Sequence, residues 1–197
     1  MNAEATDAIE AAVITTERLL LVPLCVEDAD VLADLLDDER LHEFIGGAPA
    51  SRLELHDRFV LLAAGSPRSG EDWLNWVVRF RLDSRAVGTV QATIRAEEDR
   101  RVARLGWMIG VEWQKRGFAS EAASALVGWI RRQGVDTVSA NIHPGHKASE
   151  TVAARAGLRQ TEDEWDGERV WRTPQSQGGN PVLTNAEIAA IVPVSDI

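Results

Sequence analysis

The chain has 197 residues, is 45% hydrophobic and 26% charged, and carries a formal net charge of -10. This length fits one domain with short tails, and the negative charge argues against a nucleic-acid binder, which needs a basic face for phosphates. No apolar run reaches the ~20 residues of a membrane span, and the acidic start lacks the layout of a signal peptide, so we expect a cytoplasmic protein without a membrane partner.

The N-terminal part predicts a tail, a short strand and two helices. Residues 1–14 are predicted as the tail, and the apolar residues 18–24 as the strand. Residues 27–38 place apolar side chains on one helical face. Ser51 opens a Ser-Arg-Leu-Glu capping box, which predicts that a second helix begins there and runs to about residue 64.

The middle of the chain predicts a meander of three strands. Apolar and polar residues alternate over 74–82, 86–95 and 102–109. Gly88 lies inside the second strand, where a glycine often marks a bulge or the close approach of another backbone. The charged stretch 97–101 predicts a solvated hairpin loop.

The pattern changes after residue 113. A basic, glycine-containing turn is followed by a helix over 120–133, a strand over 137–142, a helix over 148–156 and a hairpin of 158–165 with 168–173. The order β, α, α, β-β-β, α, β, α, β-β predicts an α+β fold with a mixed, mostly antiparallel sheet. Residues 175–197 form a linker and a short apolar segment, predicted to dock on the domain or to join two copies as a homodimer.

Residues 107–123 carry the chemistry, because a strand runs into a turn and a helix begins directly after it. A helix N-terminus presents unpaired N–H groups and the positive end of the helix dipole, which favours anions. Gly117 lets the backbone approach a ligand, and the N–H groups of 115–120 predict a nest for a pyrophosphate. No Walker loop or dinucleotide fingerprint is present, and taken alone this segment favours the simpler interpretation of an ordinary strand-to-helix turn with exposed basic residues.

The six residues from Gln114 to Ala119 match the signature Q/R-x-x-G-x-G/A, and the chain resembles the GNAT superfamily of N-acetyltransferases over residues 15–174. Three further segments resemble the Rim-type branch, which includes ribosomal-protein N-terminal acetyltransferases. They are Thr16-Glu17-Arg18-Leu19, then Trp107 with Glu121-Ala122, and the run from His143 to Ser149 followed by Gly157-Leu158. The resemblance implies a domain over 15–174, with the tail 1–14 and the segment 175–197 outside it.

The resemblance also implies acetyl-CoA as co-substrate, bound where the fourth and fifth strands of the fold splay apart. The backbone of residues 108–111 would bond the pantetheine arm, and the amides of 115–120 would hold the pyrophosphate. The implied cofactor-binding residues are Met108, Ile109, Gly110, Val111, Gln114, Lys115, Arg116, Gly117, Phe118, Ala119, Ser120, Asn141 and Ser149.

The implied reaction is direct attack of an amine on the thioester in a ternary complex, which gains most from holding the reactants together. Many superfamily members use a tyrosine as the donor to the departing thiolate, but this chain contains none. Ser149 is therefore predicted as the catalytic donor, and His146, which stands where the family has asparagine, as the second candidate. Three carboxylates are candidates to accept the amine proton: Glu112, Asp163 and Glu164. For each of them the simpler interpretation is a solvated surface charge.

Other side chains are predicted to have structural roles. Cys25 lies in an apolar run and is expected to be a buried thiol. His143 and His146 share a loop that no cysteine or acidic cluster completes, so no metal is expected. Trp107 and Trp113 flank the cofactor segment and are predicted to line a groove for the acceptor.

The acceptor is expected to be an amine, on a peptide or on a small molecule. Two other classes of function remain open at this point. The missing tyrosine and the substituted asparagine also fit a non-catalytic acyl-CoA-binding or regulatory module. The apolar residues 181–197 also fit an interaction protein that offers this segment to a partner.

Overall fold

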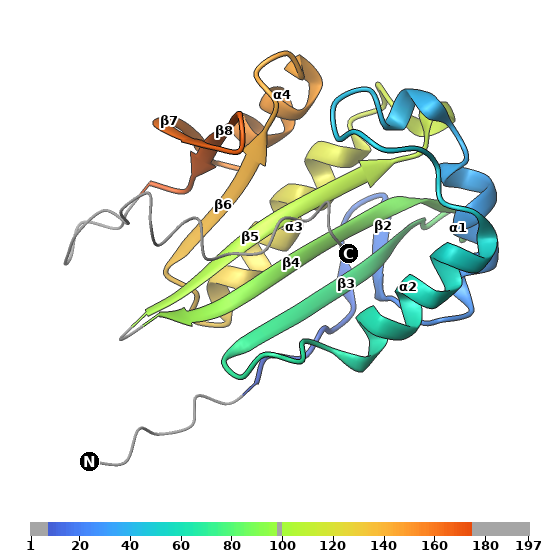
Figure 1. Cartoon of the computed structure of the whole chain (residues 1–197), viewed down its shortest axis with the longest axis horizontal. Helices are drawn as coiled ribbons and strands as arrows, with labels where there is room; N and C mark the ends of the chain where they lie inside the picture. The colour runs from blue at the N-terminus through green and yellow to red at the C-terminus, as the bar shows by residue number, and fades with distance from the viewer. Residues whose placement is uncertain (1–7, 98–99, 175–197) are drawn as a thin grey trace.

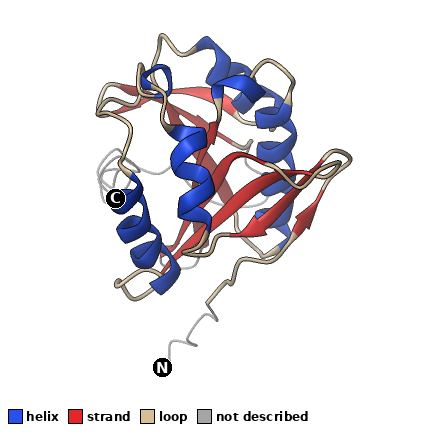
Figure 2. Ribbon diagram, turned by 90° about the vertical axis from the view of Figure 1, so that its right-hand side faces the viewer, coloured by secondary structure: helices blue, strands red, loops and turns tan. Residues whose placement is uncertain are grey.

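The computed structural model describes residues 8–97 and 100–174, which form one eight-stranded sheet with helices on both faces (Figures 1 and 2). The strand order is β1-β2-β3-β4-β5-β6-β8-β7, and neighbours are antiparallel except β5 and β6, which are parallel. The strands are β1 (Ile14–Thr15), β2 (Leu19–Pro23), β3 (Glu71–Phe80), β4 (Ala86–Glu97), β5 (Arg100–Ile109), β6 (Thr137–Ile142), β7 (Arg159–Trp165) and β8 (Glu168–Arg172). The predicted mixed α+β fold is confirmed.

Six helical segments connect these strands. They are α1 (Asp28–Leu36), the 3-10 helix η1 (Glu39–Leu41), α2 (Arg52–Ala64), the 3-10 helix η2 (Val111–Trp113), α3 (Phe118–Arg132) and α4 (Lys147–Arg155). The predicted capping box of α2 is confirmed, since Ser51 Oγ accepts the Glu54 N–H and the Glu54 carboxylate accepts the Ser51 N–H at 2.8 Å. Across the described ranges, no helix has the length and apolarity needed to cross a membrane.

Two hydrophobic clusters lie on opposite faces of the sheet. The larger packs beneath α3 and includes Trp76 and Ile130, both fully buried. The smaller packs beneath α1 and α2 and includes Leu32, Phe59 and Val77. Neighbouring residues of β3 therefore serve different clusters, because side chains alternate across a strand and helices cover both faces (Figure 2).

Several local expectations differ from the structure. Ile9 and Ile14, which fall in the stretch predicted as a tail, are buried. The sequence shows no strand pattern at Ile14 because the two-residue strand β1 is too short for a periodic signal. The expectation that Cys25 is buried is wrong: it is exposed, and its Sγ donates to Asp28 Oδ2 at 3.2 Å. Partial desolvation of the sulfur and the neighbouring Asp28 carboxylate raise the pKa of Cys25. The fraction of Cys25 present as thiolate is therefore smaller than for a free cysteine. The apolar segment within 175–197 lies outside the described residues.

The feature that positions the site is the parting of β5 and β6. These strands pair at only three positions, and the last pair is Arg104 with Ser139. By contrast, β4 follows β5 as far as the pair of Gly88 with Ile109. The last residues of β5 therefore keep one open edge, and a gap widens from there toward α4 (Figure 1). This is the splay that the family resemblance implied for the strands predicted over 102–109 and 137–142.

Gly88 is the glycine that allows β4 to follow β5 so closely. A Cβ built at Gly88 would lie 2.1 Å from the Met108 carbonyl oxygen and 2.8 Å from the Ile109 Cα. The register of β3 against β4 also shifts next to this point, between Val78 and Arg79. The predicted close backbone approach at Gly88 is confirmed.

We predict that Gly88→Ala lowers the free energy of unfolding by about 1–3 kcal/mol or more, because the backbone of β5 must move to admit the methyl group. Urea denaturation followed by circular dichroism measures this. Gly128→Ala is the matched control: its Cβ would lie 3.5 Å from Arg132 Nη1, an ordinary contact, and alanine stabilises a helix interior by roughly 0.5–1 kcal/mol. Wild-type stability in Gly88→Ala would contradict the close approach.

Candidate functional site

The turn that leads into α3 has the backbone geometry of an anion-binding nest. Lys115 and Gly117 adopt left-handed conformations with φ of 60° and 81°, whereas Arg116 between them does not. Such alternation turns successive N–H groups toward one side of the chain. A non-glycine residue in this region is uncommon, so Lys115 marks a turn that its surroundings hold in place.

The N–H groups of this turn and of the first turn of α3 are available to a ligand. Gly117 is the N-cap of α3, and no side chain caps the helix. Within residues 8–97 and 100–174, the N–H groups of residues 115–120 find no hydrogen-bond acceptor. Free N–H groups at the positive end of a helix dipole make this helix start an anion site.

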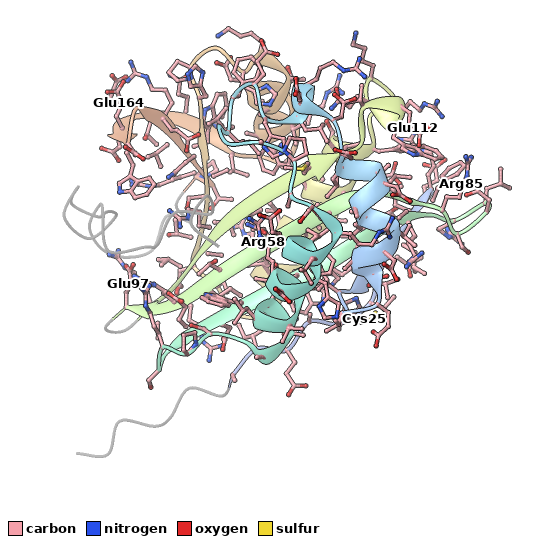
Figure 3. All side chains as sticks on the ribbon, turned by 45° about the vertical axis from the view of Figure 1, so that its right-hand side comes forward. Cys25, Arg58, Arg85, Glu97, Glu112 and Glu164 are labelled. Atoms are coloured by element: carbon pink, nitrogen blue, oxygen red, sulfur yellow. The ribbon has the colours of Figure 1, made fainter. Side chains whose placement is uncertain are left out.

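Arginine side chains surround the turn with positive charge. The guanidinium groups of Arg85 and Arg116 lie over the ring of Trp113, at 4.6 and 5.0 Å from its centroid. That of Arg18 lies 4.8 Å from the ring centroid of Phe118. Arg18 is paired with Glu121 and Arg85 with Asp83, both at 2.7 Å, whereas no ion pair among the described residues neutralises Arg116, whose charge favours an anion at the turn. The sequence pattern missed Arg85, which reaches the turn from the end of the sheet (Figure 3).

Trp113 and Phe118 support the turn from inside. Both are buried, and their rings contact each other and Phe80. The prediction that Trp113 lines an acceptor groove is therefore wrong: the 3-10 helix η2 turns its ring into the core. Phe118 contributes its backbone to the helix start, while its side chain anchors α3.

Glu121, in the first turn of α3, ties the turn to the segment before β2. Its Oε1 accepts the Thr16 hydroxyl at 2.6 Å and the Arg18 N–H at 2.9 Å, and its Oε2 accepts Arg18 Nε at 2.7 Å. Arg18 Nη1 also donates to the Arg116 carbonyl at 3.0 Å. Burial alone would raise the pKa of Glu121, but the hydrogen bonds from Thr16 and Arg18 outweigh it and lower the pKa. We name these three residues, Thr16, Arg18 and Glu121, the turn clamp.

The open edge of β5 offers backbone groups beside the turn. The Gly110 N–H donates to a β4 carbonyl at 2.9 Å, so alternation directs the backbone groups of Ile109 and Trp107 away from β4. Gln114 Nε2 donates to the Ile109 carbonyl at 3.0 Å and joins the turn to this edge. Of residues 108–111, Ile109 thus directs its backbone N–H and C=O toward the gap, while the backbone groups of Met108 and Gly110 point toward β4.

The other side of the gap is formed by β6 and the start of α4. Asn141 lies on β6 beyond the last pair with β5, where β6 pairs only with β8 on its opposite edge. Trp107 Nε1 donates to Ser149 Oγ at 3.3 Å and so joins β5 to α4. The structure therefore brings the predicted donor Ser149 to the open edge of β5.

His146, the N-cap of α4, is held against the connection between α1 and α2. Its ring stacks on Phe44 with centroids 4.4 Å apart and an interplanar angle of 15°. Burial lowers the pKa of His146, against the opposing effect of the Glu43 carboxylate. His146 is therefore mainly neutral near pH 7, which weakens it as a proton donor. Phe44 carried no sequence signal because it lies in an irregular connection.

The three predicted proton acceptors do not come together at the gap. Glu112 and Glu164 lie at separate ends of the molecule in Figure 3. Glu164 pairs with Arg169 at 3.0 Å, and Asp163 with Arg172 at 2.9 Å. A fourth carboxylate, which the sequence did not single out, has the more suitable electrostatics.

That fourth carboxylate is Glu168, the half-buried first residue of β8. Burial raises the pKa of Glu168, although His143 and Arg104 act in the opposite direction. A carboxylate with a raised pKa is better suited to take a proton near neutral pH than an exposed one. The sequence pattern does not reveal Glu168, because a glutamate directly after an Asp-Gly turn has the pattern of a solvated hairpin residue.

An open strand edge that leads to an uncapped, nest-bearing helix start, opposite a diverging strand, is the arrangement that the resemblance to acetyl-CoA-dependent acetyltransferases implies. The Acetyltransferase (GNAT) domain matches residues 18–159, and the chain belongs to this family. The predicted assignment as an acetyl-CoA-dependent N-acetyltransferase is thereby confirmed at the level of the family, and a non-catalytic module is not favoured.

Individual relatives agree in sequence and fold. The uncharacterised N-acetyltransferase YoaA of Bacillus subtilis is 23% identical over 174 residues, which cover 88% of this chain and 93% of YoaA. Ribosomal-protein-S5-alanine acetyltransferase of Vibrio fischeri superposes with a TM-score of 0.69 at 15% identity, over 84% of this chain and 98% of that one. AAC(6')-Ib, in complex with paromomycin and acetyl-CoA, gives a TM-score of 0.65 at 15% identity, over 82% of this chain and 95% of that one.

We predict that Glu121→Gln destabilises the protein by about 1–2 kcal/mol at pH 7, because it removes the charge from the turn clamp. A carboxyl whose pKa is lowered by folding stabilises the protein above its unfolded-state pKa. That contribution is lost as the pH falls through the folded-state pKa, below the ordinary value of 4.5. Urea denaturation over a pH series should therefore show the two proteins converging in acid.

The exposed Glu162 of β7 provides the control for this series. Glu162→Gln should track the wild type at every pH. A stability difference between wild type and Glu121→Gln that persists unchanged below pH 3 would show that the clamp does not act through the ionised carboxylate.

Proposed function

We propose that acetyl-CoA lies along the open edge of β5, with its pyrophosphate on the N–H groups of residues 115–120. The observation that carries this proposal is the uncapped start of α3 after the left-handed residues Lys115 and Gly117, directly beside that edge. Arg116 supplies positive charge beside the phosphates, and Arg18, paired with Glu121, holds the turn in place. Ile109, Asn141 and Ser149 flank the path from the turn to the start of α4.

We further propose that a neutral amine attacks the thioester carbonyl near the start of α4. A C–N bond forms, the C–S bond breaks, and the sulfur takes the hydroxyl proton of Ser149. The attacking nitrogen loses its proton through water, and that proton restores the serine hydroxyl. We propose Glu168, whose pKa is raised by burial, as the carboxylate that holds the proton in between. Holding amine and thioester together supplies much of the rate gain, and the donor lowers the cost of thiolate departure.

The acceptor that we propose is the primary amine of a peptide N-terminus. Vibrio fischeri ribosomal-protein-S5-alanine acetyltransferase, which shares the fold, is named for a protein substrate. A second candidate is a small cationic amine, which the net charge of -10 favours through electrostatic steering. A thiol-release assay with acetyl-CoA against peptides with free N-termini, polyamines and aminoglycosides distinguishes them. Thiol release no faster than hydrolysis with every amine would count against catalysis.

We predict that Gly117→Glu abolishes acetyl-CoA binding, because a carboxylate and a side chain then occupy the phosphate position. Isothermal titration calorimetry measures the loss. Gly134→Glu is the matched control, since Gly134 follows α3 with a similar φ of 78° and has nothing within 4 Å of an added Cβ. It imposes the same charge and backbone strain away from the site and should bind normally. Retained affinity in Gly117→Glu would refute the phosphate position.

We predict that Ser149→Ala lowers kcat roughly 10²-fold, because the departing sulfur loses its donor, while the affinity for acetyl-CoA changes little. Steady-state kinetics with the best acceptor of the screen, together with calorimetry, separates the two effects. Ser124→Ala is the control, since the hydroxyl of Ser124 bonds the Arg155 carbonyl at the end of α4. Unchanged turnover in Ser149→Ala would remove Ser149 from the mechanism.

A further inference from the structure

The hydrogen bond from Trp107 to Ser149 crosses the gap between β5 and α4. Trp107 lies beyond the last pair of β5 with β6, where β5 has no further neighbour on that side. Its Nε1 nevertheless reaches Ser149 Oγ at 3.3 Å, although the two residues are 42 positions apart in the chain. Trp107 packs against the large core cluster and pairs with Val90 of β4, so strand and core hold the indole in place.

The chemistry of the two groups fixes the direction of this bond. An indole N–H can only donate, whereas a serine hydroxyl has one proton and two lone pairs. Ser149 Oγ is therefore the acceptor, and its own proton must point away from Trp107. Within the part of the chain that the structure describes, Ser149 Oγ donates no hydrogen bond.

A serine in a helix more often satisfies its hydroxyl on the local backbone. Thr151 in the same helix does so, donating to the Lys147 carbonyl at 2.9 Å. Ser149 makes no such bond among the described residues, and its oxygen instead accepts the indole N–H from β5. The hydroxyl proton is thus kept out of the helix and free for a group bound in the gap.

We infer that Trp107 is a positioning residue for acetyl transfer, whose indole N–H orients the Ser149 hydroxyl so that its proton faces the departing sulfur. This inference rests on the donor role that we propose for Ser149. A tyrosine would deliver its proton from a rigid ring, but this chain has none. A serine hydroxyl rotates freely, so a fixed partner is needed to restrict it to one direction.

The indole also suits the charge changes of the transfer. When the C–S bond breaks, the sulfur takes the proton of Ser149, and negative charge builds on Oγ until the proton lost by the amine replaces it. The Trp107 N–H remains bonded to Oγ throughout and stabilises that charge. It neither ionises nor accepts a proton in this range, so it cannot compete for the proton being moved.

Trp107→Phe keeps an aromatic ring and removes only the N–H donor. We expect kcat to fall roughly tenfold, as for the loss of one hydrogen bond in the transition state, while the KM and Kd for acetyl-CoA stay within about twofold. In the Ser149→Ala background the same substitution should have no further effect on kcat, because the partner is already gone. Additive losses in the double variant would overturn the inference.

Trp171→Phe is the matched control. Trp171 is also partly buried against the core, but its Nε1 has no hydrogen-bond partner among the described residues. Removing this N–H should leave kcat at the wild-type value. Loss of activity in both phenylalanine variants to the same extent would mean that a tryptophan ring, rather than the Trp107 N–H, is what matters, and would overturn the inference.

The hydrogen bond itself can be observed without any acceptor. The chain has seven tryptophans, and the indole N–H signal of Trp107 in a 1H–15N spectrum is the one absent from Trp107→Phe. Ser149→Ala should shift this signal, whereas Ser124→Ala should not. An unmoved signal would overturn the inference even if turnover falls.

The turnover of the two single variants distinguishes an error in the role of Trp107 from an error in the role of Ser149. If Ser149→Ala is slow and Trp107→Phe is as fast as the wild type, the positioning role of Trp107 is wrong and the donor role of Ser149 stands. If the wild type transfers acetyl groups and Ser149→Ala keeps full turnover, the donor role is wrong, and the positioning role falls with it.

Discussion

The site depends on one constraint, which is that β5 and β6 stop pairing after three positions. Backbone N–H and C=O groups at a strand edge need partners, and a ligand is the partner that a gap inside a sheet admits. The gap is stable because each strand is secured elsewhere: β5 pairs with β4 along its length, and β6 pairs with β8. Both strands also bury side chains beneath α3, so they can diverge without separating from the core.

The proposed phosphate end of the site is built by contacts between distant parts of the chain. The turn before α3 holds a left-handed lysine, and its conformation is supported by Arg18 and Glu121 rather than by local sequence preference. Glu121 also places a negative charge in the first turn of α3, where the helix dipole favours it. Arg18 is paired with Glu121, so the positive charge beside the turn comes from Arg116, for which the described residues form no ion pair.

The sequence predicted those features whose cause is local. The signature from Gln114 to Ala119, the capping box at Ser51 and the close approach at Gly88 each depend on a few neighbouring residues, and the structure bears out the capping box and the close approach. Features that depend on long-range packing were missed or misjudged. Phe44 meets His146 from a loop without periodicity, and Trp113 turns into the core because η2 redirects it. Exposure of Cys25 likewise follows from where α1 begins, which an apolar run does not reveal.

These contacts also bear on which group serves the departing thiolate. His146 is stacked on Phe44, and burial lowers its pKa, so it lacks the proton that a donor needs near neutral pH. The chain has no tyrosine, which leaves hydroxyl groups as the remaining donors of suitable reach. Of these, Ser149 is the one that a side chain of β5 already holds at the gap. The donor that we propose therefore gains its direction from a neighbour, and the proposed chemistry belongs to the pair of Trp107 and Ser149 rather than to one side chain.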